Sequence, residues 1–512
     1  MTQIMRNPRS TSRRPELLLD LIALDRTSDE PLYRQLYLRL VELIMDGSLP
    51  KDGRLPSSRA LAQKIKVSRN TVVSAYQQLD VEGYVQAQRG SQTFVAAAPA
   101  GSSARRPQAP KEFADPLSRR GRQIVSQPMN FFGLAHRRSL QPGLPDVTQF
   151  PFVTLRRIIA RRLQAGGDYV FGYQHIAGYP PLKRAIARYL AVARGVRCEP
   201  DQVVITNGAQ PAFDLLARIL TDPGDSVWME DPGYPAAQSA FVAAGASILP
   251  LTVSAEGWDL SPSSEARIRA IYVTPSCQSP LGLTMRLDQR LRLAEIAREH
   301  AAWIVEDDFD GEYRFSGNAV PALQSVTADS RTIYVGTFSK TLFPALRIGY
   351  VILPLNMVAN ISQAMYLTGQ YASGILQAAL ADFIEEGHFT THLGRMRRLY
   401  GKRREDFMVR CQSELGEWLD PIPVDSGIQS LWYCREGLDD VEITNRAREN
   451  GVVVTPLSLH YRQSRPRHGL ILGYTALEPP ALHGELRTLR RIFIDLTTGR
   501  QAKHLADQDV DR

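Results

Sequence analysis

Cysteine is scarce in this sequence of 512 residues, and the four that occur stand far apart, at Cys198, Cys277, Cys411 and Cys434. There is no Cys-x-x-Cys pair and no cluster of histidine with cysteine. Such patterns mark disulfide-stapled domains and zinc sites. The sequence therefore predicts neither a disulfide framework nor a metal site, and it suits a reducing compartment.

Long apolar runs are also missing. No segment approaches the roughly 18 apolar residues that a membrane-spanning helix needs. The apolar stretch 17–24 is interrupted by Asp20 and lacks a small-residue cleavage site, so we do not interpret it as a signal peptide. We therefore expect a cytoplasmic protein with no membrane partner, whose 44% hydrophobic content can build cores in two or more domains.

Net charge is absent from most of the chain. The formal charge of +8 is carried by residues 1–122, which hold 20 Lys and Arg against 12 Asp and Glu, whereas the other 390 residues hold 41 of each sign. Positive charge confined to one end indicates a head that binds a polyanion, on a neutral body. A basic tail without a function would give the same charge, so charge alone does not decide.

Composition divides the chain into regions. Residues 26–95 are expected to form a compact helical domain closed by a short β-ribbon, after a loose arm over 1–25. Residues 96–128 are rich in Ala, Pro, Ser and Arg, which is typical of a flexible, basic linker. From 129 to 500, β-prone runs alternate with amphipathic segments, which predicts an α/β fold with a mostly parallel sheet. The predicted strands include 203–206, 226–229, 270–273, 303–305 and 332–335, and 289–300 is a predicted helix.

The head has the pattern of a helix-turn-helix. Residues 31–47 show one apolar face and end at a glycine, and two shorter helices with serine caps are expected after Leu55 and after Val67. The last helix opens in polar and basic residues, and a pair of strands with a glycine at its tip follows it. This order predicts a winged helix-turn-helix, with a small helical docking domain as the alternative.

The same geometry suggests how the head would contact DNA. Arg69 and Asn70, at the start of the third helix, would read base edges in the major groove. Phosphates would be bound by Arg59 and Thr71, and the wing residues Arg89 and Gly90 would enter the neighbouring minor groove.

In the body, Lys340 stands on a predicted turn just after the buried strand 332–335. A lysine there is either badly desolvated or used covalently. Two hydroxyls, Thr337 and Ser339, and the guanidinium of Arg347 lie close to it in sequence. An amine for a Schiff base, with hydroxyls and a guanidinium for a phosphate, is suited to an aldehyde cofactor with a phosphate tail. The alternative is a surface lysine on a polar turn.

Three further segments of the body fit such a cofactor. Residues 206–210 follow a strand and open a helix, where backbone N–H groups can cradle a phosphate. Tyr234 follows a tight turn and can stack on a planar ring. Carboxylates at 306–310 end the strand that begins at Trp303, and one of them can pair with a pyridinium nitrogen. A metal site or a solvated turn is the alternative for this acidic cluster.

The head resembles the GntR family of winged-helix regulators nearly end to end. The matching segments are LPSSRALAQKIKVSRNTVVSAYQQLDVEGYV and RGSQTFV, in which Gln92 replaces a usual glycine. The resemblance implies DNA-contacting roles for Arg59, Ser68, Arg69, Asn70, Thr71, Arg89 and Gly90.

The body, over about 140–500, resembles the fold-type I pyridoxal-phosphate aminotransferases. With the head, the whole chain resembles the MocR/GabR-type regulators, through GLPDVTQFP, DPGYP, TPSCQSPLG, EDDFDGEYRF and TFSKTLFPALRIGY. This implies a multidomain protein with an N-terminal all-α winged helix-turn-helix domain and a C-terminal α/β aminotransferase-like domain that binds pyridoxal 5'-phosphate. The implied roles are the Schiff base for Lys340, the pyridine nitrogen for Asp307, ring stacking for Tyr234, and the phosphate for Gly208, Ala209, Gln210, Thr337, Ser339, Arg347 and, from the other subunit, Tyr173.

The sequence departs from that family around the expected ring. Phe309 replaces a tyrosine and cannot donate to the cofactor's phenolic oxygen. Cys277 and Ser279 replace a histidine and an aromatic residue, and Gln174-His-Ile replaces Gly-Asp-Pro. These changes leave the expected lysine, aspartate and phosphate anchors in place and alter the effector pocket. We interpret Cys277 as a buried, unreactive thiol.

A carboxylate-bearing substrate also needs an arginine. The strand expected to carry it reads Gly469-Leu-Ile-Leu-Gly-Tyr474 and contains none. Arg465 and Arg467 are the nearest candidates, and solvated loop charge is an equally good interpretation of both.

The sequence thus predicts a homodimeric transcription regulator that binds a double-stranded DNA operator. Its body would sense an amine or amino-acid effector, or pyridoxal phosphate itself, through the Lys340 Schiff base. The alternative is an active aminotransferase with a DNA-binding appendage.

Overall fold

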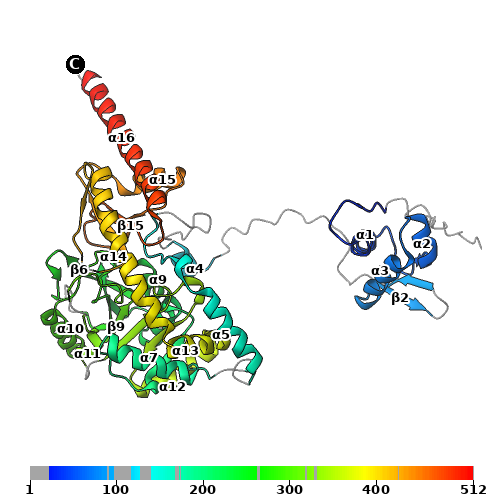
Figure 1. Ribbon diagram of the computed structural model, residues 1–512, viewed down its shortest axis with the longest axis horizontal. Coiled ribbons are helices and arrows are strands. Elements are labelled where there is room, and N and C mark those ends of the chain that lie inside the picture. The colour runs from blue at the N-terminus through cyan, green and yellow to red at the C-terminus, as the bar shows by residue number, and fades with distance from the viewer. Residues whose placement is uncertain are drawn as a thin grey trace, which may run out of the picture. The chain divides into compact units, whose positions relative to one another are not determined.

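A computed structural model describes residues 22–88, 92–96, 117–126, 140–167, 172, 175–261, 266–317, 320–327, 331–424 and 426–510. Of residues 87–88 and 499–510 only the backbone is described. The chain splits into two compact units, Met1–Pro116 and Leu117–Arg512 (Figure 1).

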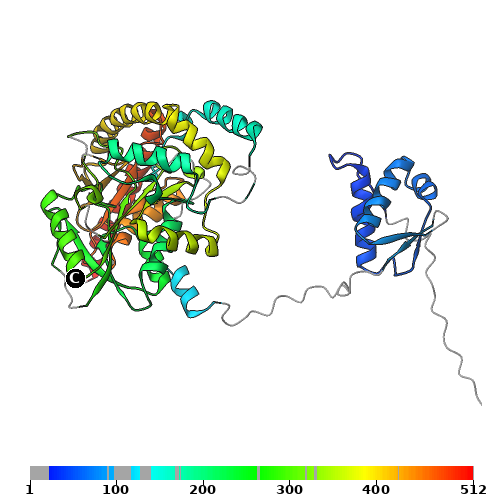
Figure 2. The ribbon, with the colours of Figure 1, turned by 90° about the horizontal axis from the view of Figure 1, so that it is seen from below.

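The first unit confirms the predicted winged helix-turn-helix. Its short antiparallel sheet has the order β1-β3-β2, and β1 is a third strand that the sequence did not suggest. Figure 2 shows this sheet beside the three helices. The elements are α1 (Leu32–Met45), β1 (Arg54–Leu55), α2 (Ser58–Lys64), α3 (Arg69–Val81), β2 (Val85–Gln88) and β3 (Gln92–Val95).

The caps and the apolar spacing explain these helices. Ser57 accepts a hydrogen bond from the Ala60 N–H at the start of α2, and Ser68 accepts one from the Thr71 N–H at the start of α3. Apolar side chains at helical spacing in α1 pack against those of α2 and α3 in one core. Ile22 is buried in this core, so the packed domain begins before residue 26.

The second unit is built on an eight-stranded sheet, and all five predicted strands are confirmed. The neighbours β10, β9, β8, β5 and β6 pair in parallel, whereas β11 runs antiparallel to both β10 and β4. The strand order is β4 (Val203–Thr206), β11 (Gly349–Ile352), β10 (Thr332–Thr337), β9 (Trp303–Asp308), β8 (Ile268–Val273), β5 (Ser226–Asp231), β6 (Ser247–Ser254) and β7 (Gly257–Trp258).

Helices cover both faces of this sheet, as Figures 1 and 2 show. Successive strand residues enter opposite cores: Ile205 and Tyr334 pack on one side, and Val204 and Val335 on the other. The first side is covered by α5 (Phe152–Ala165), α7 (Pro180–Ala193) and α13 (Gly374–Glu385), and the second by α8 (Ala209–Leu220), α9 (Pro235–Ala244) and α12 (Leu355–Thr368). The remaining helices here are α10 (Leu287–Glu299), which confirms the prediction at 289–300, and α11 (Leu323–Val326).

A second, smaller sheet lies in the C-terminal part of this unit. Its order is β12-β13-β15-β14, and all of its neighbouring strands pair antiparallel. A core of its own joins it to the long helices. The elements are α14 (His388–Leu415), β12 (Leu419–Pro421), β13 (Gln429–Cys434), α15 (Asp440–Glu449), β14 (Thr455–Pro456), β15 (Gly469–Gly473) and α16 (Pro479–Val510).

The segment assigned to the linker contains a helix, α4 (Arg119–Val125). It contacts α9, and the Arg120 guanidinium donates to the Ala243 carbonyl at 2.5 Å. The second unit therefore includes residues from Leu117 onward, earlier than the expected start at 129. Residues 97–116, which keep the prediction of a linker, lie outside the described range.

Within the part of the chain described, none of the helices combines the length and apolar character that a membrane span requires. The four cysteines form no disulfide. Burial raises the pKa of the Cys277 thiol well above its ordinary value, which fits the expected unreactive side chain.

Candidate functional site

The predicted cofactor residues gather at one edge of the large sheet. Val335 in β10 pairs with Asp307 in β9, so the turn that carries Lys340 and the carboxyl end of β9 lie side by side. The next strands in the sheet, β11 and β4, bring in Gly349 and the turn at Gly208. This edge is where α/β sheets bind ligands.

Three adjacent carboxylates end β9, and the structure distinguishes them. Glu306 accepts the backbone N–H groups of Leu323 and Gln324, at 2.6 and 2.8 Å. Asp308 accepts two hydrogen bonds from Arg194, at 2.6 and 3.0 Å, and one from the Tyr334 hydroxyl at 2.6 Å. These two side chains are engaged within the protein.

Asp307 differs from its neighbours because one of its oxygens is unused. Its Oδ2 accepts the Tyr272 hydroxyl at 2.6 Å, whereas its buried Oδ1 has no hydrogen-bond partner among the described residues. Burial raises the pKa of Asp307 to about 7, against the lowering effect of the Tyr272 hydrogen bond. A buried acceptor without a donor is costly, so this atom is suited to a ligand N–H.

The Lys340 ammonium donates to the Gly143 carbonyl at 2.6 Å. Burial lowers the pKa of Lys340, while the nearby carboxylates of Asp310 and Asp307 oppose that shift. A lysine whose neutral form is favoured is prepared to attack an aldehyde. Gly143 has φ +70°, and a methyl group there would lie 2.7 Å from the Lys340 Nζ. The close approach therefore depends on glycine.

An anion cradle lies on the other side of the turn. Gly208 begins α8 with φ 97°, and an added methyl group would lie 3.2 Å from an Arg347 nitrogen. Arg347 donates to the Asn207 carbonyl at 3.1 Å. The Thr337 and Ser339 hydroxyls are 3.1 Å apart. A helix N-terminus, a guanidinium and two hydroxyls form a donor set for a phosphate.

Tyr234 is close enough to both halves of the site to be affected by their charges. Burial is the largest cause that raises its pKa to about 12, and the charges of Asp307 and Arg347 also act on it, in opposite directions. Gln210 donates to the Ala236 carbonyl at 2.7 Å, near the start of α9, while its Oε1 is buried without a partner among the described residues.

The donor set fits pyridoxal phosphate. If that cofactor is bound, Lys340 would meet its aldehyde, the free Asp307 oxygen a protonated ring nitrogen, and Tyr234 the ring. Tyr173, which the resemblance placed near the phosphate of the other subunit, lies outside the described residues, as does Gln174.

Arg465 and Arg467 were expected near the effector, but the structure does not bring Arg467 to Lys340. Its guanidinium carbon lies 3.3 Å from the centre of the Tyr433 ring, beside the Gly469 end of β15. Lys340 and Gln429 both lie near the methyl position of Gly143, and Gln429 pairs with Gly473 at the other end of β15. That end is four residues, or about 14 Å along a strand, from Gly469. Arg465 is exposed and follows a loop whose N–H groups bind Asp231.

The sequence did not single out two residues that complete the site. Tyr272, the donor to Asp307, sits in a predicted strand with nothing local to mark it. Gly143 belongs to the GLPD segment, but its contact spans 197 positions in sequence. Arg194, which fixes Asp308, also donates to the Ser276 hydroxyl at 2.6 Å and so links β9 to the loop that carries Cys277.

In the head, the expected DNA-contacting residues gather at the start of α3 and on α2. Arg59, Ser68, Arg69 and Asn70 are exposed, and Thr71 is half-buried. Arg69 Nε donates to the Ser58 hydroxyl at 3.4 Å, which holds this arginine between the two helices. Arg89 and Gly90 lie outside the described residues, so the wing tip remains a prediction.

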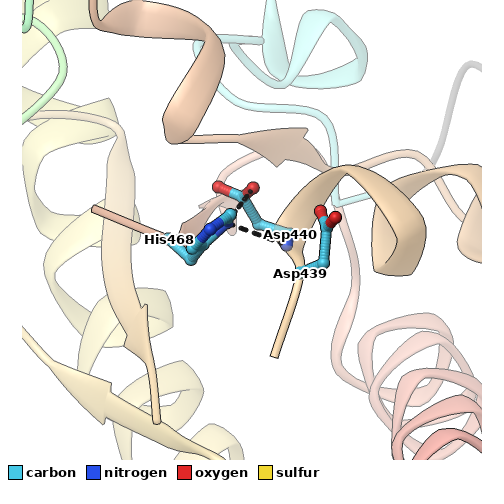
Figure 3. Close-up of side chains that lie close together, drawn as sticks. All are labelled: Asp439, Asp440 and His468. Atoms are coloured by element: carbon cyan, nitrogen blue, oxygen red, sulfur yellow. Dashed lines mark hydrogen bonds and ion pairs between the residues drawn. The ribbon is translucent and has the colours of Figure 1, made fainter. Parts of the chain in front are cut away.

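A group with metal-ligand chemistry also occurs among the described residues, formed by Asp439, Asp440 and His468 (Figure 3). Asp440 is fully buried, and its oxygens accept from Ser458 N and Oγ, Gly469 N and His468 Nδ1 at 2.7–3.0 Å. Asp439 caps α15. These contacts describe a hydrogen-bond network that joins α15 to the smaller sheet.

Two family descriptions match the chain. Residues 32–95 match the bacterial regulatory proteins of the gntR family, and residues 146–468 match aminotransferase class I and II. The second match covers the site edge described above.

Whole-length relatives carry the same two parts. The chain is 44% identical to the probable rhizopine catabolism regulatory protein MocR of Rhizobium meliloti. The match covers 93% of this chain and 96% of that relative. It is 29% identical to the pyridoxine biosynthesis regulator PdxR of Corynebacterium glutamicum, in a match that covers 90% of this chain and 95% of that relative.

Among solved structures, LysN, the α-aminoadipate aminotransferase of Thermus thermophilus complexed with N-(5'-phosphopyridoxyl)-L-leucine, is similar with a TM-score of 0.66. It is 28% identical, and the match covers 71% of this chain and 94% of that one. The chain therefore belongs to the MocR-type transcriptional regulators, in which a GntR helix-turn-helix domain is joined to a class I and II aminotransferase-like domain.

Proposed function

We propose that this protein is a pyridoxal-phosphate-dependent regulator that senses an amine or amino-acid effector at Lys340. The observation that carries the proposal is that a half-buried lysine with a lowered pKa, on the turn after β10, lies beside the unpartnered oxygen of Asp307 at the end of the adjacent strand β9. A single chain joins this site to a DNA-binding domain. We place the regulator in the cytoplasm, with its operator.

Each part of the cofactor has a proposed partner. Lys340 binds the aldehyde carbon, Asp307 holds the proton on the ring nitrogen, and Tyr234 packs on the ring. The phosphate is bound by Gly208, Ala209, Gln210, Thr337, Ser339 and Arg347, with Tyr173 from the other subunit. When bound, the cofactor supplies an electrophilic imine carbon that a primary amine can attack.

An effector amine that took the place of Lys340 would leave the lysine amine free to donate to the Gly143 carbonyl in segment 140–146, the contact that it makes in the cofactor-free protein. That segment also binds the smaller sheet, because Gly473 N donates to the Leu140 carbonyl at 2.7 Å. An amine changes DNA binding only if it favours one arrangement of these parts over another.

The head supplies the DNA contacts. Arg69 and Asn70 read base edges, Arg59, Ser68 and Thr71 bind the phosphate backbone, and Arg89 and Gly90 enter the minor groove. A homodimer would present two heads to two half-sites of a double-stranded operator.

The first test removes the proposed covalent bond. Lys340→Ala, reconstituted with excess pyridoxal phosphate, should lose the visible absorbance of the imine and the pyridoxyl adduct left by borohydride. Lys402→Ala, a change at an exposed lysine of α14, is the matched control and should keep both. A wild-type protein that stays colourless and yields no adduct would refute the proposal.

An active aminotransferase is the second candidate, favoured by the similarity to LysN. Phe309 and the absence of an arginine within β15, all of whose residues are described, argue against efficient turnover. Incubation with amino donors and keto acids decides between them, because only an enzyme releases many equivalents of new keto acid.

A third hypothesis is that the cofactor itself is the signal, and the same reconstitution separates it from the first. If DNA affinity changes on adding pyridoxal phosphate and does not change further with any amine, the body senses the cofactor alone. An added response to an amine supports effector sensing.

A further inference from the structure

A second buried carboxylate, Asp310, lies beside Lys340 and is not used by the proposed cofactor contacts. This residue is only 1% exposed. Its Oδ2 accepts the Ile428 N–H at 2.8 Å, and its buried Oδ1 has no hydrogen-bond partner among the described residues. One oxygen of Asp310 is therefore fixed, and the other is left for a donor.

Contacts place the Asp310 carboxylate in the same part of the site as Lys340. A methyl group added at Gly427 would lie 3.2 Å from both Asp310 Oδ2 and Cys277 Sγ. Gln429 follows Gly427 by two residues. A methyl group added at Gly143 would lie 3.7 Å from Gln429 Oε1 and 2.7 Å from Lys340 Nζ. Asp310, Cys277, Gln429 and Lys340 thus border one region around the reactive amine.

Electrostatics supports the same placement. Of the two carboxylates that oppose the lowering of the Lys340 pKa, Asp310 has the larger effect and Asp307 the smaller. Burial raises the pKa of Asp310, and the positive charge of Lys340 acts in the opposite direction. A cation in this space would favour the ionised form of Asp310, which accepts hydrogen bonds, whereas a ligand carboxylate would disfavour that form.

The nearby guanidinium groups are placed for other contacts. Arg347 lies at the phosphate cradle, and Arg467 lies over Tyr433. Arg314 is the main alternative group that could bind a ligand carboxylate, because it is close enough for its charge to act on Cys277. Its Nη1 donates to the Thr284 hydroxyl at 3.3 Å.

We propose that Asp310 selects the effector: it accepts a hydrogen bond from a second amine or a hydroxyl, so the preferred ligands are diamines and amino alcohols rather than amino acids. This inference rests on the proposed cofactor site and narrows the class of amine that it recognises. The primary amine of the ligand reacts at the position of Lys340, and its second polar group pairs with the free oxygen of Asp310.

The test uses the full-length protein loaded with pyridoxal phosphate and a matched set of four-carbon probes. These are 1,4-diaminobutane, 4-amino-1-butanol, butylamine and 4-aminobutanoate, each titrated by absorbance. We expect the diamine and the amino alcohol to bind more tightly than butylamine by on the order of tenfold, as for a hydrogen bond to a charged group, and 4-aminobutanoate to bind most weakly.

Asp310→Asn tests the residue itself. It should remove the advantage of the diamine over butylamine, because the amide cannot become a charged acceptor, and improve the relative affinity of 4-aminobutanoate, because the amide N–H can donate to a carboxylate. Asp288→Asn, at an exposed residue of α10, should leave the order of the probes unchanged. If Asp310→Asn fails to fold, the order measured with the wild-type protein still decides.

The proposal is overturned if 4-aminobutanoate binds to the wild type more tightly than the other probes. If Arg314→Leu then abolishes that preference, Arg314 binds the ligand carboxylate instead. It is also overturned if Asp310→Asn leaves the order of the probes unchanged. Failure of the cofactor site is recognised separately, because the imine absorbance would then be absent before any probe is added.

Discussion

The unused oxygen of Asp307 predicts that the cofactor-free protein is destabilised by the group that later binds the cofactor. An aspartate in the unfolded chain has a pKa of about 3.9. In the folded protein burial raises the pKa of Asp307 to about 7. Between these values the folded state holds more protons than the unfolded state, so stability falls as pH rises and levels off above about 7.

Replacing Asp307 by asparagine removes this dependence. The asparagine side chain would keep an acceptor for the Tyr272 hydroxyl and would carry no ionisable group. Between pH 5 and the folded pKa near 7, ionisation of Asp307 lowers the stability of the wild type by about 2 kcal/mol, a loss that the variant does not show. Any constant cost of the buried amide cancels, because the prediction concerns how the difference changes with pH.

The measurement is urea unfolding of the two cofactor-free proteins at about pH 5, 6, 7 and 8, which spans the two pKa values. All five tryptophans lie beyond residue 116, so their fluorescence follows the second unit alone. Asp307→Asn should gain stability relative to wild type as pH rises to 7 and should bind pyridoxal phosphate more weakly, by roughly 10- to 100-fold. A difference that stays constant over this pH range would refute the assigned burial of the charge.

Two further predictions concern the phosphate cradle and the head. Gly349→Ala should weaken cofactor binding, because a methyl group there would lie 2.8 Å from the Gly208 carbonyl carbon. The control is Gly394→Ala in α14, where an added methyl group meets nothing within 4 Å. Equal cofactor affinities of the two variants would contradict the expected crowding. Arg69→Ala should reduce specific DNA binding by about 1–3 kcal/mol if it makes a bidentate base contact. A loss that is equal on operator and random DNA would instead identify Arg69 as a phosphate contact.

The fold could be predicted wherever local pattern and tertiary role agree. The buried strands of the large sheet are short β-prone runs, and the caps Ser57 and Ser68 mark the helices of the head, so both were found from the sequence. The strand β1 was missed because two residues carry no periodicity. The helix α4 was missed because its composition resembles a linker and its contact with α9 is not local.

The sequence by itself determined the two domains and the family and predicted the role of Lys340, because these depend on residue types at fixed local spacing. The family resemblance had already singled out Asp307 among the three carboxylates, but only tertiary structure shows that one of its oxygens is free, since alternate residues of β9 face different neighbours. Tertiary structure also brought Gly143 and Asp310 to Lys340 and kept Arg467 away from it. Contacts between segments tens to hundreds of residues apart depend on how strands are ordered and paired, and no local pattern encodes that order.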